Sequence, residues 1–282
     1  MNIYVVGDVM LDVEMQVQPR ENYEGAAICL TGTRQIYYPG GAANVAALLQ
    51  GLGHNVSLFG LVGSDWAGKE LYNVLNKIEK HCLALLLTTT VKTRIHDDGM
   101  LIRVDCENPK ACDWAVERCL REIESTCPDC VVFSDYGKGV FDRHVKVAVQ
   151  RIIQREPAIP TVVDPKLCNY ADIWDGCTVA TPTAEEVDQL VLNVRSIATT
   201  HGAEGAVVTD DFGITAIPCR EVENPQTVGA GDAFTAGIAS ALSQGDNIMK
   251  AAQFAVEFAT DYVSQPRAEA YSKRWGREGF RL

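Results

Sequence analysis

Residues 227–234, with the sequence TVGAGDAF, place the carboxylate of Asp232 directly after a run of small residues. Apolar residues at helical spacing follow, so Gly229, Ala230 and Gly231 should stand at the start of a helix. The unpaired amides at such a start favour an anion, and glycines let a phosphate approach the backbone closely. An anion cradle beside a proton acceptor is what phosphoryl transfer to an alcohol requires. On these residues alone, a glycine-rich helix start with an acidic first turn is an equally good interpretation.

A second glycine-marked helix start is found at residues 39–46, PGGAANVA. Gly40 and Gly41 permit unusual backbone angles and close ligand approach, and the side chain of Asn44 can both donate and accept hydrogen bonds. Taken alone, this segment is only a helix cap.

Composition limits the classes of protein to consider. The chain has 282 residues, 47% of them hydrophobic and 22% charged, which suits one large α/β domain or two small ones. A net charge of -12 argues against nucleic acid as a partner. The start of the chain lacks a signal-peptide pattern and no apolar run could span a bilayer, so we expect a cytoplasmic protein with no membrane partner. The basic segment 267–282 should be solvated or loosely docked.

Ten cysteines are scattered along the chain, and only Cys127 and Cys130 have the spacing of a metal or redox pair. No second such pair completes a four-cysteine site, and the five histidines form no metal-ligand pattern. Buried reduced thiols are therefore favoured over a functional pair.

Apolar strand-like runs alternate with amphipathic stretches, which predicts an α/β fold with a mostly parallel sheet between helices. The predicted strands are 3–7, 56–60, 130–134, 161–164, 178–180 and 206–209, and the predicted helices are 42–52, 67–78, 114–124, 143–155, 184–190, 233–242 and 248–262. Such folds bind ligands at the carboxyl ends of the strands. Five acidic residues fall at such ends: Asp8, Asp12, Asp135, Asp164 and Asp210.

Residues 13–38 and 88–105 are too polar and too alternating to be helical. Within the second segment, residues 91–96 and 100–104 flank an Asp-Gly turn, a pattern typical of a β-hairpin. The two segments predict a small sheet projecting from a single domain that spans residues 1–282. This sheet would serve as a lid over substrate or as a dimerisation surface, and a homodimer is our expectation.

Together these segments resemble the ribokinase-like (PfkB) carbohydrate kinases over residues 1 to 262 or so. The resemblance implies a three-layer α/β/α sandwich with a mostly parallel central sheet and a small projecting β-sheet lid. Residues 6–12, 101–105, 134–139 and 163–166 are similar to one branch, the D-glycero-D-manno-heptose 7-phosphate kinases, which occur alone or as the N-terminal half of a bifunctional ADP-heptose synthesis enzyme. We expect no nucleotidyltransferase in this chain.

The resemblance also implies roles for individual residues. Asp232 would take the proton of the sugar hydroxyl, and the amides of Gly229, Ala230 and Gly231 would stabilise the transferring phosphoryl group. Residues lining the sugar site would be Asp12, Gly40, Gly41, Asn44, Arg103, Asp135 and Lys138, with Arg103 and Lys138 suited to a phosphate already on the substrate. Residues near ATP would be Lys166, Thr183, Glu186, Thr209 and Gly213, with Glu186 organising Mg²⁺.

Several departures from the family pattern lie on the nucleotide side. Thr183 replaces the Asn of an Asn-x-x-Glu motif, Gln226 replaces an Asp, and Val256 and Glu257 stand where adenine neighbours are expected. The chain is also short between Thr183 and Gly229, which predicts a truncated helix near residues 191–200. Nucleotide affinity and the use of a monovalent cation such as K⁺ therefore stay open.

The leading hypothesis is an ATP-dependent, Mg²⁺-requiring kinase that phosphorylates a sugar or sugar phosphate. Heptose 7-phosphate, phosphorylated at its anomeric hydroxyl, is the favoured substrate. The alternatives are a ribose, fructose or nucleoside kinase, and a catalytically degenerate protein that binds a sugar phosphate or nucleotide as a sensor or subunit.

Overall fold

A central β-sheet organises the fold. The computed structural model describes residues 1–20, 29–75, 78–86, 88–97, 99–107, 113–155, 159–166 and 170–267. Within them, the strands of this sheet are β1 (Asn2–Gly7), β4 (Asn55–Gly63), β5 (Glu79–Leu86), β8 (Cys130–Ser134), β9 (Thr161–Asp164), β10 (Val179–Ala180), β11 (Ser196–Thr200), β12 (Ala206–Asp210) and β13 (Gly213–Ile217). Their order is β13-β12-β11-β10-β9-β8-β1-β4-β5. The strands from β11 to β5 are parallel, and β12 and β13 add an antiparallel hairpin at one edge.

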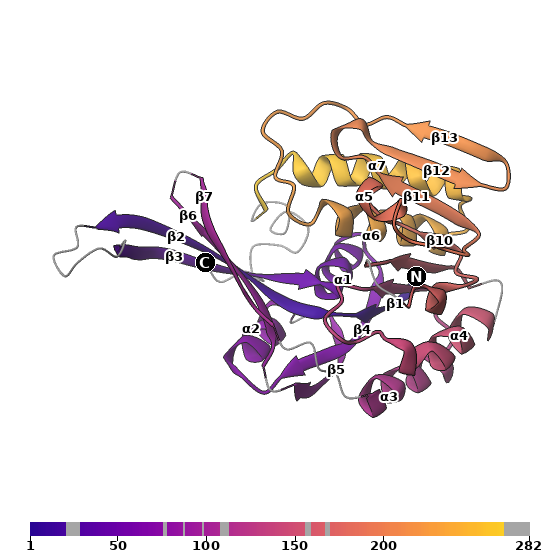
Figure 1. Cartoon of the computed structure of the whole chain (residues 1–282), viewed down its shortest axis with the longest axis horizontal. Coiled ribbons are helices and arrows are strands. Elements are labelled where there is room, and N and C mark those ends of the chain that lie inside the picture. Colours follow the sequence, from indigo (N-terminus) through magenta and orange to yellow (C-terminus); the bar gives the residue numbers. More distant parts are fainter. Residues whose placement is uncertain are drawn as a thin grey trace.

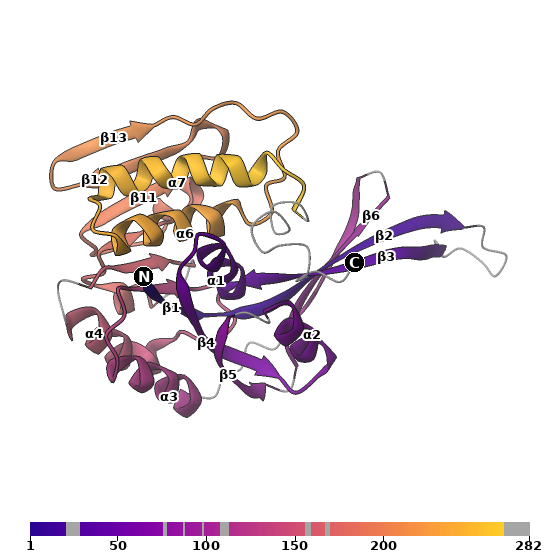
Figure 2. The same ribbon diagram turned by 180° about the vertical axis from the view of Figure 1, so that it is seen from behind.

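Helices cover both faces of this sheet, as Figure 1 and the reverse view in Figure 2 show. The helices are α1 (Ala42–Gly51), α2 (Trp66–Val74), α3 (Asp113–Glu124), α4 (Lys146–Arg155), α5 (Ala184–Val187), α6 (Ala230–Ser243) and α7 (Ile248–Val263), with short 3₁₀ turns η1 (Arg143–Val145), η2 (Ala171–Trp174) and η3 (Gly202–Glu204). One apolar core joins α1, α2, α6 and α7 to the sheet, and a second lies under α3, α4 and η2. Alternate strand residues supply the two cores, so Val5 enters the first and Val6 the second.

A smaller sheet extends from the body (Figure 1). Its strands are β2 (Val9–Arg20), β3 (Cys29–Gly41), β6 (Thr90–His96) and β7 (Met100–Cys106), in the order β3-β2-β6-β7. The strand register gives it one charged face, which carries Asp12, Glu14, Lys92, Arg94, Arg103 and Asp105. The opposite face is apolar. There Leu11 and Val13 are buried near α2, whereas Ile102 and Val104 are exposed.

The predicted fold class is confirmed, and so is the small separate sheet with its hairpin. Three strands were missed, namely β5, β11 and β13. The sequence of β5 follows an amphipathic helix without a break, and the predicted helix 67–78 accordingly ends early, at Val74. The small side chains of β11 and the exposed edge position of β13 give weak strand signals. The strand that leads into the small sheet starts at Val9, so Asp12 belongs to this sheet.

No helix in the described part of the chain is long and apolar enough to cross a membrane. Among the described cysteines, Cys127 and Cys130 form no disulfide. Cys130 is buried in the strand β8, and burial raises the pKa of its thiol.

Candidate active site

Helix α6 packs against the central strands β8 and β9, and its first turn contacts the loop that follows the carboxyl end of β8. Gly229 caps this helix with a left-handed backbone (φ 87°) that favours glycine. A Cβ on Gly229 would lie 2.7 Å from both Asn44 Nδ2 and Tyr262 Oη, whereas a Cβ on Gly231 would meet no atom within 4 Å. The chain therefore packs tightly behind Gly229 and leaves room beside Gly231.

Asp232 stands in the first turn of α6 and is only 5% exposed. Its Oδ2 accepts a hydrogen bond of 2.5 Å from Asn44 Nδ2, and its Oδ1 accepts one of 2.6 Å from the Tyr136 hydroxyl. Burial raises the pKa of Asp232 to about 6, although these two hydrogen bonds act in the opposite direction. The two predicted helix starts thus meet at one carboxylate, since Asn44 belongs to α1.

Tyr136 and Lys138 lie on a loop that a buried carboxylate holds in place. Asp8, at the end of β1, accepts hydrogen bonds from the backbone amides of Tyr136, Lys138 and Val140 at 2.8, 3.0 and 3.1 Å. Asp135 accepts one of 2.8 Å from the Gly137 amide. Burial and the nearby Asp8 raise the pKa of Asp135 to about 7. Both carboxylates therefore shape the loop that presents Tyr136 to Asp232.

The predicted sugar ligand Asp12 is buried at the base of the small sheet. Its Oδ2 accepts a hydrogen bond of 2.8 Å from Arg267 and lies 3.4 Å from Arg94 Nη1. Its buried Oδ1 has no hydrogen-bond partner among the described residues. A Cβ on Gly40 would lie 2.9 Å from this oxygen, which explains the glycine there.

The segment 267–282 was expected to be solvated or loosely docked, but its first residue, Arg267, is firmly buried. It is 6% exposed and stacks over the ring of Tyr38, with its guanidinium carbon 4.5 Å from the ring centroid. It also donates to the carbonyl of Pro39 at 3.1 Å. The remainder of that segment lies outside the described residues.

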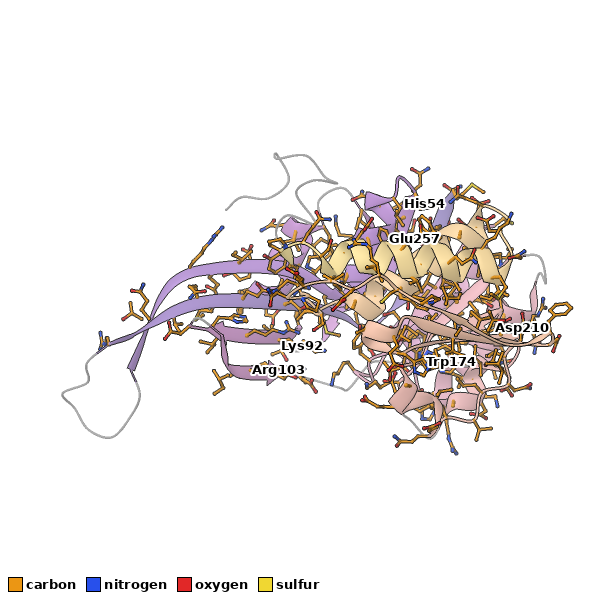
Figure 3. The ribbon with its side chains drawn as sticks, turned by 90° about the horizontal axis from the view of Figure 1, so that it is seen from above. His54, Lys92, Arg103, Trp174, Asp210 and Glu257 are labelled. Carbon is orange, nitrogen blue, oxygen red and sulfur yellow. The ribbon has the colours of Figure 1, made fainter. Side chains whose placement is uncertain are left out.

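The two predicted phosphate-binding cations both have carboxylate partners. Arg103 forms two hydrogen bonds with Asp105, of 2.8 and 2.6 Å, and Lys138 lies 2.7 Å from Glu107. Lys92 lies opposite Asp12 and Asp105 on the charged face, and its Nζ stands 4.9 Å from the ring centroid of Tyr136. Figure 3 shows Lys92 and Arg103 where the small sheet meets the body.

Three predicted nucleotide-side residues come together beyond β9 and β10. Lys166 Nζ donates to Glu186 Oε1 at 2.8 Å, and the Thr183 amide and hydroxyl each donate to Oε2 at 3.0 Å. Burial acts to raise the pKa of Glu186, but these hydrogen bonds outweigh it and hold the pKa below its ordinary value. Asp164 lies within electrostatic range of Glu186 and Asp232, and its pKa is raised by burial and by those carboxylates. These groups offer carboxylate oxygens and an ammonium beside the start of α6.

Thr209 and Gly213 are not brought to this cluster. Thr209 pairs with Ile197, near the amino end of β11, because β12 runs antiparallel to the other strands. The tip of the β12–β13 hairpin therefore lies at the amino ends of the parallel strands, opposite the ends that carry the candidate site. Figure 3 shows Asp210, in this hairpin, far from Lys92. At the site edge, the β11–β12 connection is anchored by Thr200, whose amide donates to the Pro182 carbonyl at 3.0 Å. Gly202, in that turn, has a left-handed backbone with φ 57°.

The residues that depart from the family pattern on the nucleotide side lie in and after α5 and on α7. Thr183 caps the single turn of α5, and residues 188–195 contain no helix. Val256 is buried on α7, and Glu257, which is labelled on this helix in Figure 3, is exposed.

Sequence reasoning missed Tyr136, Lys92, Arg94 and Arg267 as site residues. Tyr136 had a signal, since it lies inside the motif 134–139. Alternation of charge along residues 92–94 could have indicated Lys92 and Arg94, since period-2 residues share a face. Arg267 contacts Asp12 across 255 positions, and no local pattern points to it.

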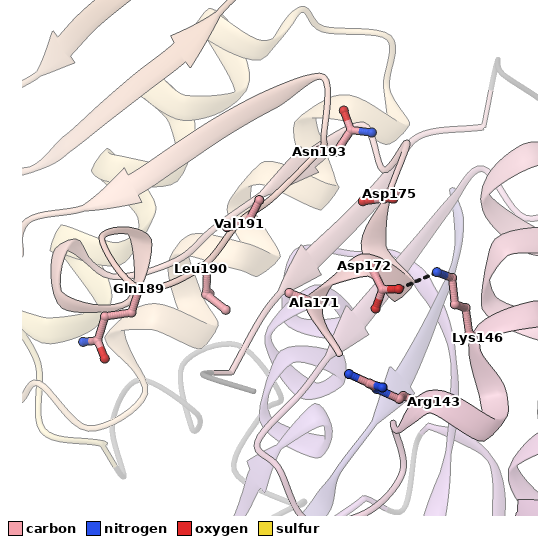
Figure 4. Close-up of a pocket in the computed structure, with 9 residues that line it drawn as sticks. All are labelled: Arg143, Lys146, Ala171, Asp172, Asp175, Gln189, Leu190, Val191 and Asn193. Carbon is pink, nitrogen blue, oxygen red and sulfur yellow. Dashed lines mark hydrogen bonds and ion pairs between the residues drawn. The ribbon is translucent and has the colours of Figure 1, made fainter. Parts of the chain in front are cut away.

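A surface cavity of about 580 Å³ lies between the start of α4, η2 and the loop after α5 (Figure 4). Lys146 and Asp172 form an ion pair of 2.5 Å at its rim. The described residues that line it include no residue singled out from the sequence. This cavity is therefore separate from the cluster around Asp232.

A mostly parallel sheet with a buried carboxylate at a glycine-marked helix start, and with a small charged sheet extending from it, is the architecture of a carbohydrate kinase. The family model described as "pfkB family carbohydrate kinase" matches residues 1–79 and 138–273. The chain belongs to this family.

Curated relatives add detail. The chain is 30% identical over 282 residues to "Bifunctional protein HldE" of Coxiella burnetii strain RSA 331, and 30% identical over 281 residues to that of Aliivibrio salmonicida. Each match covers 90% of this chain but 58% of the relative, so the chain spans well under two thirds of their length.

Solved structures agree on the fold. Phosphofructokinase-2 from Escherichia coli superimposes with a TM-score of 0.77 at 15% identity, covering 97% of this chain and 98% of that one. Arabidopsis thaliana ribokinase, solved with ribose and ATP, gives a TM-score of 0.70 at 16% identity, covering 96% and 97%.

Proposed function

We propose that this carbohydrate kinase transfers the γ-phosphoryl group of ATP to a hydroxyl of a sugar phosphate, with D-glycero-D-manno-heptose 7-phosphate and its anomeric hydroxyl as the favoured acceptor. The observation that carries the proposal is the buried Asp232, held by Asn44 and Tyr136 at the open start of α6. The relatives named HldE support the choice of acceptor.

In the proposed reaction, Asp232 accepts the proton of the attacking hydroxyl. A carboxylate whose pKa is raised to about 6 is a better base than an ordinary one and is still ionised at neutral pH. The amides of Gly229, Ala230 and Gly231 stabilise charge on the transferring phosphoryl group. Asp12, Gly40, Gly41 and Asn44 line the sugar site. The Oδ1 of Asp12, for which the described part of the chain supplies no hydrogen-bond partner, suits a sugar hydroxyl.

The residues on the nucleotide side fit ATP with Mg²⁺. Glu186 and Asp164 would supply hard oxygen ligands of the kind Mg²⁺ prefers, and Mg²⁺ held there would neutralise phosphate charge. Lys166 and Thr183 would contact the phosphates of bound ATP in exchange for their present hydrogen bonds to Glu186. The turn at Gly202 is a better candidate than Thr209 or Gly213 for contact with the nucleotide.

The test is coupled ADP release over a panel of sugars and sugar phosphates, with the wild type and Asp232→Asn. Loss of a positioned base should lower kcat by about 10²–10⁴. Asp246→Asn, at the exposed turn after the other end of α6, is the matched control and should keep full activity. Full activity of Asp232→Asn would overturn the proposed role.

A degenerate binding protein is the second candidate, because both oxygens of Glu186 are already engaged within the chain. Calorimetric titration separates the two. Tight binding of a sugar phosphate without binding of an ATP analogue, and without turnover, would favour the sensor.

The proposal also covers assembly and location. We infer that each chain forms one domain that spans residues 1–282. The small sheet of this domain would close over the acceptor as a lid, and it would also join two chains into a homodimer. We place the kinase in the cytoplasm, where ATP is available, and assays with and without K⁺ will decide the need for a monovalent cation.

A further inference from the structure

The proposed base Asp232 accepts hydrogen bonds from two segments that lie far apart in the sequence. Asn44 donates from the first turn of α1, and Tyr136 donates from the loop that follows β8. A carboxylate held in this way keeps one orientation only while both donors stay in place. The residues that fix these two segments therefore bear on the reaction, although they lie behind the site.

The carboxylate of Asp8 fixes the segment that carries Tyr136. Asp8 follows β1 directly and is 2% exposed. Its Oδ2 accepts hydrogen bonds from the amides of Tyr136 and Lys138, and its Oδ1 accepts one from the amide of Val140. Burial raises the pKa of Asp8, whereas these three amides act to lower it. Since both oxygens accept from the loop, the carboxylate holds the backbone of the residue whose side chain reaches Asp232.

The backbone of Asp8 meets the other donor segment. The amide of Ala42, the first residue of α1, donates to the Asp8 carbonyl at 3.0 Å. A Cβ on Gly41 would lie 2.4 Å from the same carbonyl oxygen, so the start of α1 packs directly on Asp8. The Asp8 amide donates to the Ser134 carbonyl at 3.1 Å, at the end of β8. Asp8 thus contacts both segments that supply Asp232 with its hydrogen-bond donors.

We propose that Asp8 is a positioning residue for phosphoryl transfer: its carboxylate places the hydroxyl of Tyr136, and that hydroxyl orients Asp232 toward the attacking alcohol. The inference rests on the proposed function, because it takes Asp232 as the base. Asp8 is buried among the amides of the loop, so its effect on the reaction passes through Tyr136.

The test is a double-mutant cycle of Asp8→Asn and Tyr136→Phe, assayed by ADP release with a sugar phosphate acceptor. Asp8→Asn keeps the shape of the side chain but replaces one acceptor oxygen with a donor, so at least one of the three amides loses its partner. Asp8→Asn alone should lower kcat by about tenfold, the effect of one charge-assisted hydrogen bond. With Tyr136→Phe already present, it should lower kcat by less than about twofold more. The KM values for ATP and for the acceptor should not change.

The acid limb of the pH–rate profile provides a second measurement. Loss of the Tyr136 hydrogen bond raises the pKa of Asp232, so Asp8→Asn should move the limb to higher pH. Removal of a negative charge near Asp232 would by itself move the limb to lower pH, which makes the sign decisive. Other charged groups that act on Asp232 are the same in both proteins, namely Asp12 on β2, Asp164 on β9 and Arg267 after α7.

Asp65→Asn is the matched control. The carboxylate of Asp65 likewise accepts from backbone amides, those of Gly68 and Thr89, but it holds the start of α2. Asp65→Asn should lower the free energy of unfolding in urea and leave kcat unchanged. Should Asp8→Asn fail to fold, Gly137→Ala disturbs the same loop, because Gly137 has a left-handed backbone with φ 65°. Its effect on kcat should also depend on the hydroxyl of Tyr136.

Three outcomes would overturn the inference. An equal fold-loss of kcat with and without Tyr136→Phe would mean that Asp8 supports only the fold. A raised KM for the acceptor at unchanged kcat would mean that Asp8 acts through Lys138. Full activity of Asp8→Asn beside an inactive Asp232→Asn would refute this inference and leave the proposed function intact, whereas full activity of Asp232→Asn would refute both.

Discussion

Asp232 is the residue whose environment controls the chemistry, and its burial has a consequence for pH. Because burial raises its pKa to about 6, the ionised form that accepts a proton is lost as the pH falls through 6. We expect kcat/KM to be level above neutral pH and to fall about tenfold per unit well below pH 6. A pH–rate profile with a stable sugar phosphate acceptor measures this. An acid limb near pH 4 would show that Asp232 is not the titrating base.

Tyr136 should influence the position of that limb. Its hydroxyl donates a 2.6 Å hydrogen bond that lowers the pKa of Asp232. Tyr136→Phe should therefore move the acid limb to higher pH and reduce the rate at pH 7. Tyr4→Phe, far from the site against Phe59, is the matched control. A profile unchanged by Tyr136→Phe would contradict a direct link between the two side chains.

The two glycines at the start of α6 should respond differently to an added methyl group. Gly229→Ala forces a left-handed backbone onto a side chain and brings it against Asn44 and Tyr262, so both stability and activity should fall. The methyl group of Gly231→Ala would meet no described atom within 4 Å outside its own helix, so the free energy of unfolding should not fall. Activity should fall nonetheless, because the methyl group blocks close approach of a phosphate. Urea unfolding and ADP release measure the two effects, and an active Gly231→Ala would refute that approach.

At the scale of elements, Arg267 connects the segment after α7 to the small sheet. Its guanidinium is buried against Asp12, Pro39 and Tyr38. Arg267→Met leaves Asp12 with Arg94 alone and should lower the free energy of unfolding by about 3 kcal/mol. Arg220→Met breaks an exposed ion pair with Asp261 and should change it by less than about 0.5 kcal/mol. Equal effects in urea unfolding would show that burial of Arg267 contributes no stability.

The same connection shows where prediction from sequence succeeds and where it stops. Alternating apolar runs predict parallel strands, and the two glycine motifs then meet at one sheet edge, where Asn44 contacts Asp232. The direction of a strand, however, depends on its neighbours. The sequence of residues 206–209 indicates a strand but not its direction, and because β12 runs antiparallel to β11, Thr209 lies beside Ile197 near the amino end of β11. Contacts such as that of Arg267 with Asp12 depend on the packing of distant segments and leave no local pattern.

At the scale of the whole molecule, the apolar face of the small sheet predicts self-association. Ile102 and Val104 on β7 are 50% and 43% exposed, on a sheet that extends away from the body (Figure 1). Pairing two such faces would bury them without disturbing the charged face that meets the site, which suits a symmetric dimer. Ile102→Asp should therefore shift the protein from dimer to monomer in sedimentation velocity.

Ile102→Asp should also raise the KM for the acceptor, because a lid anchored to a partner is held in place more firmly than a free one. Val191→Asp, at an exposed apolar side chain far from the small sheet, should leave the mass unchanged. A wild-type protein that sediments as a monomer at micromolar concentration would exclude the dimer and leave the small sheet with the role of a lid alone.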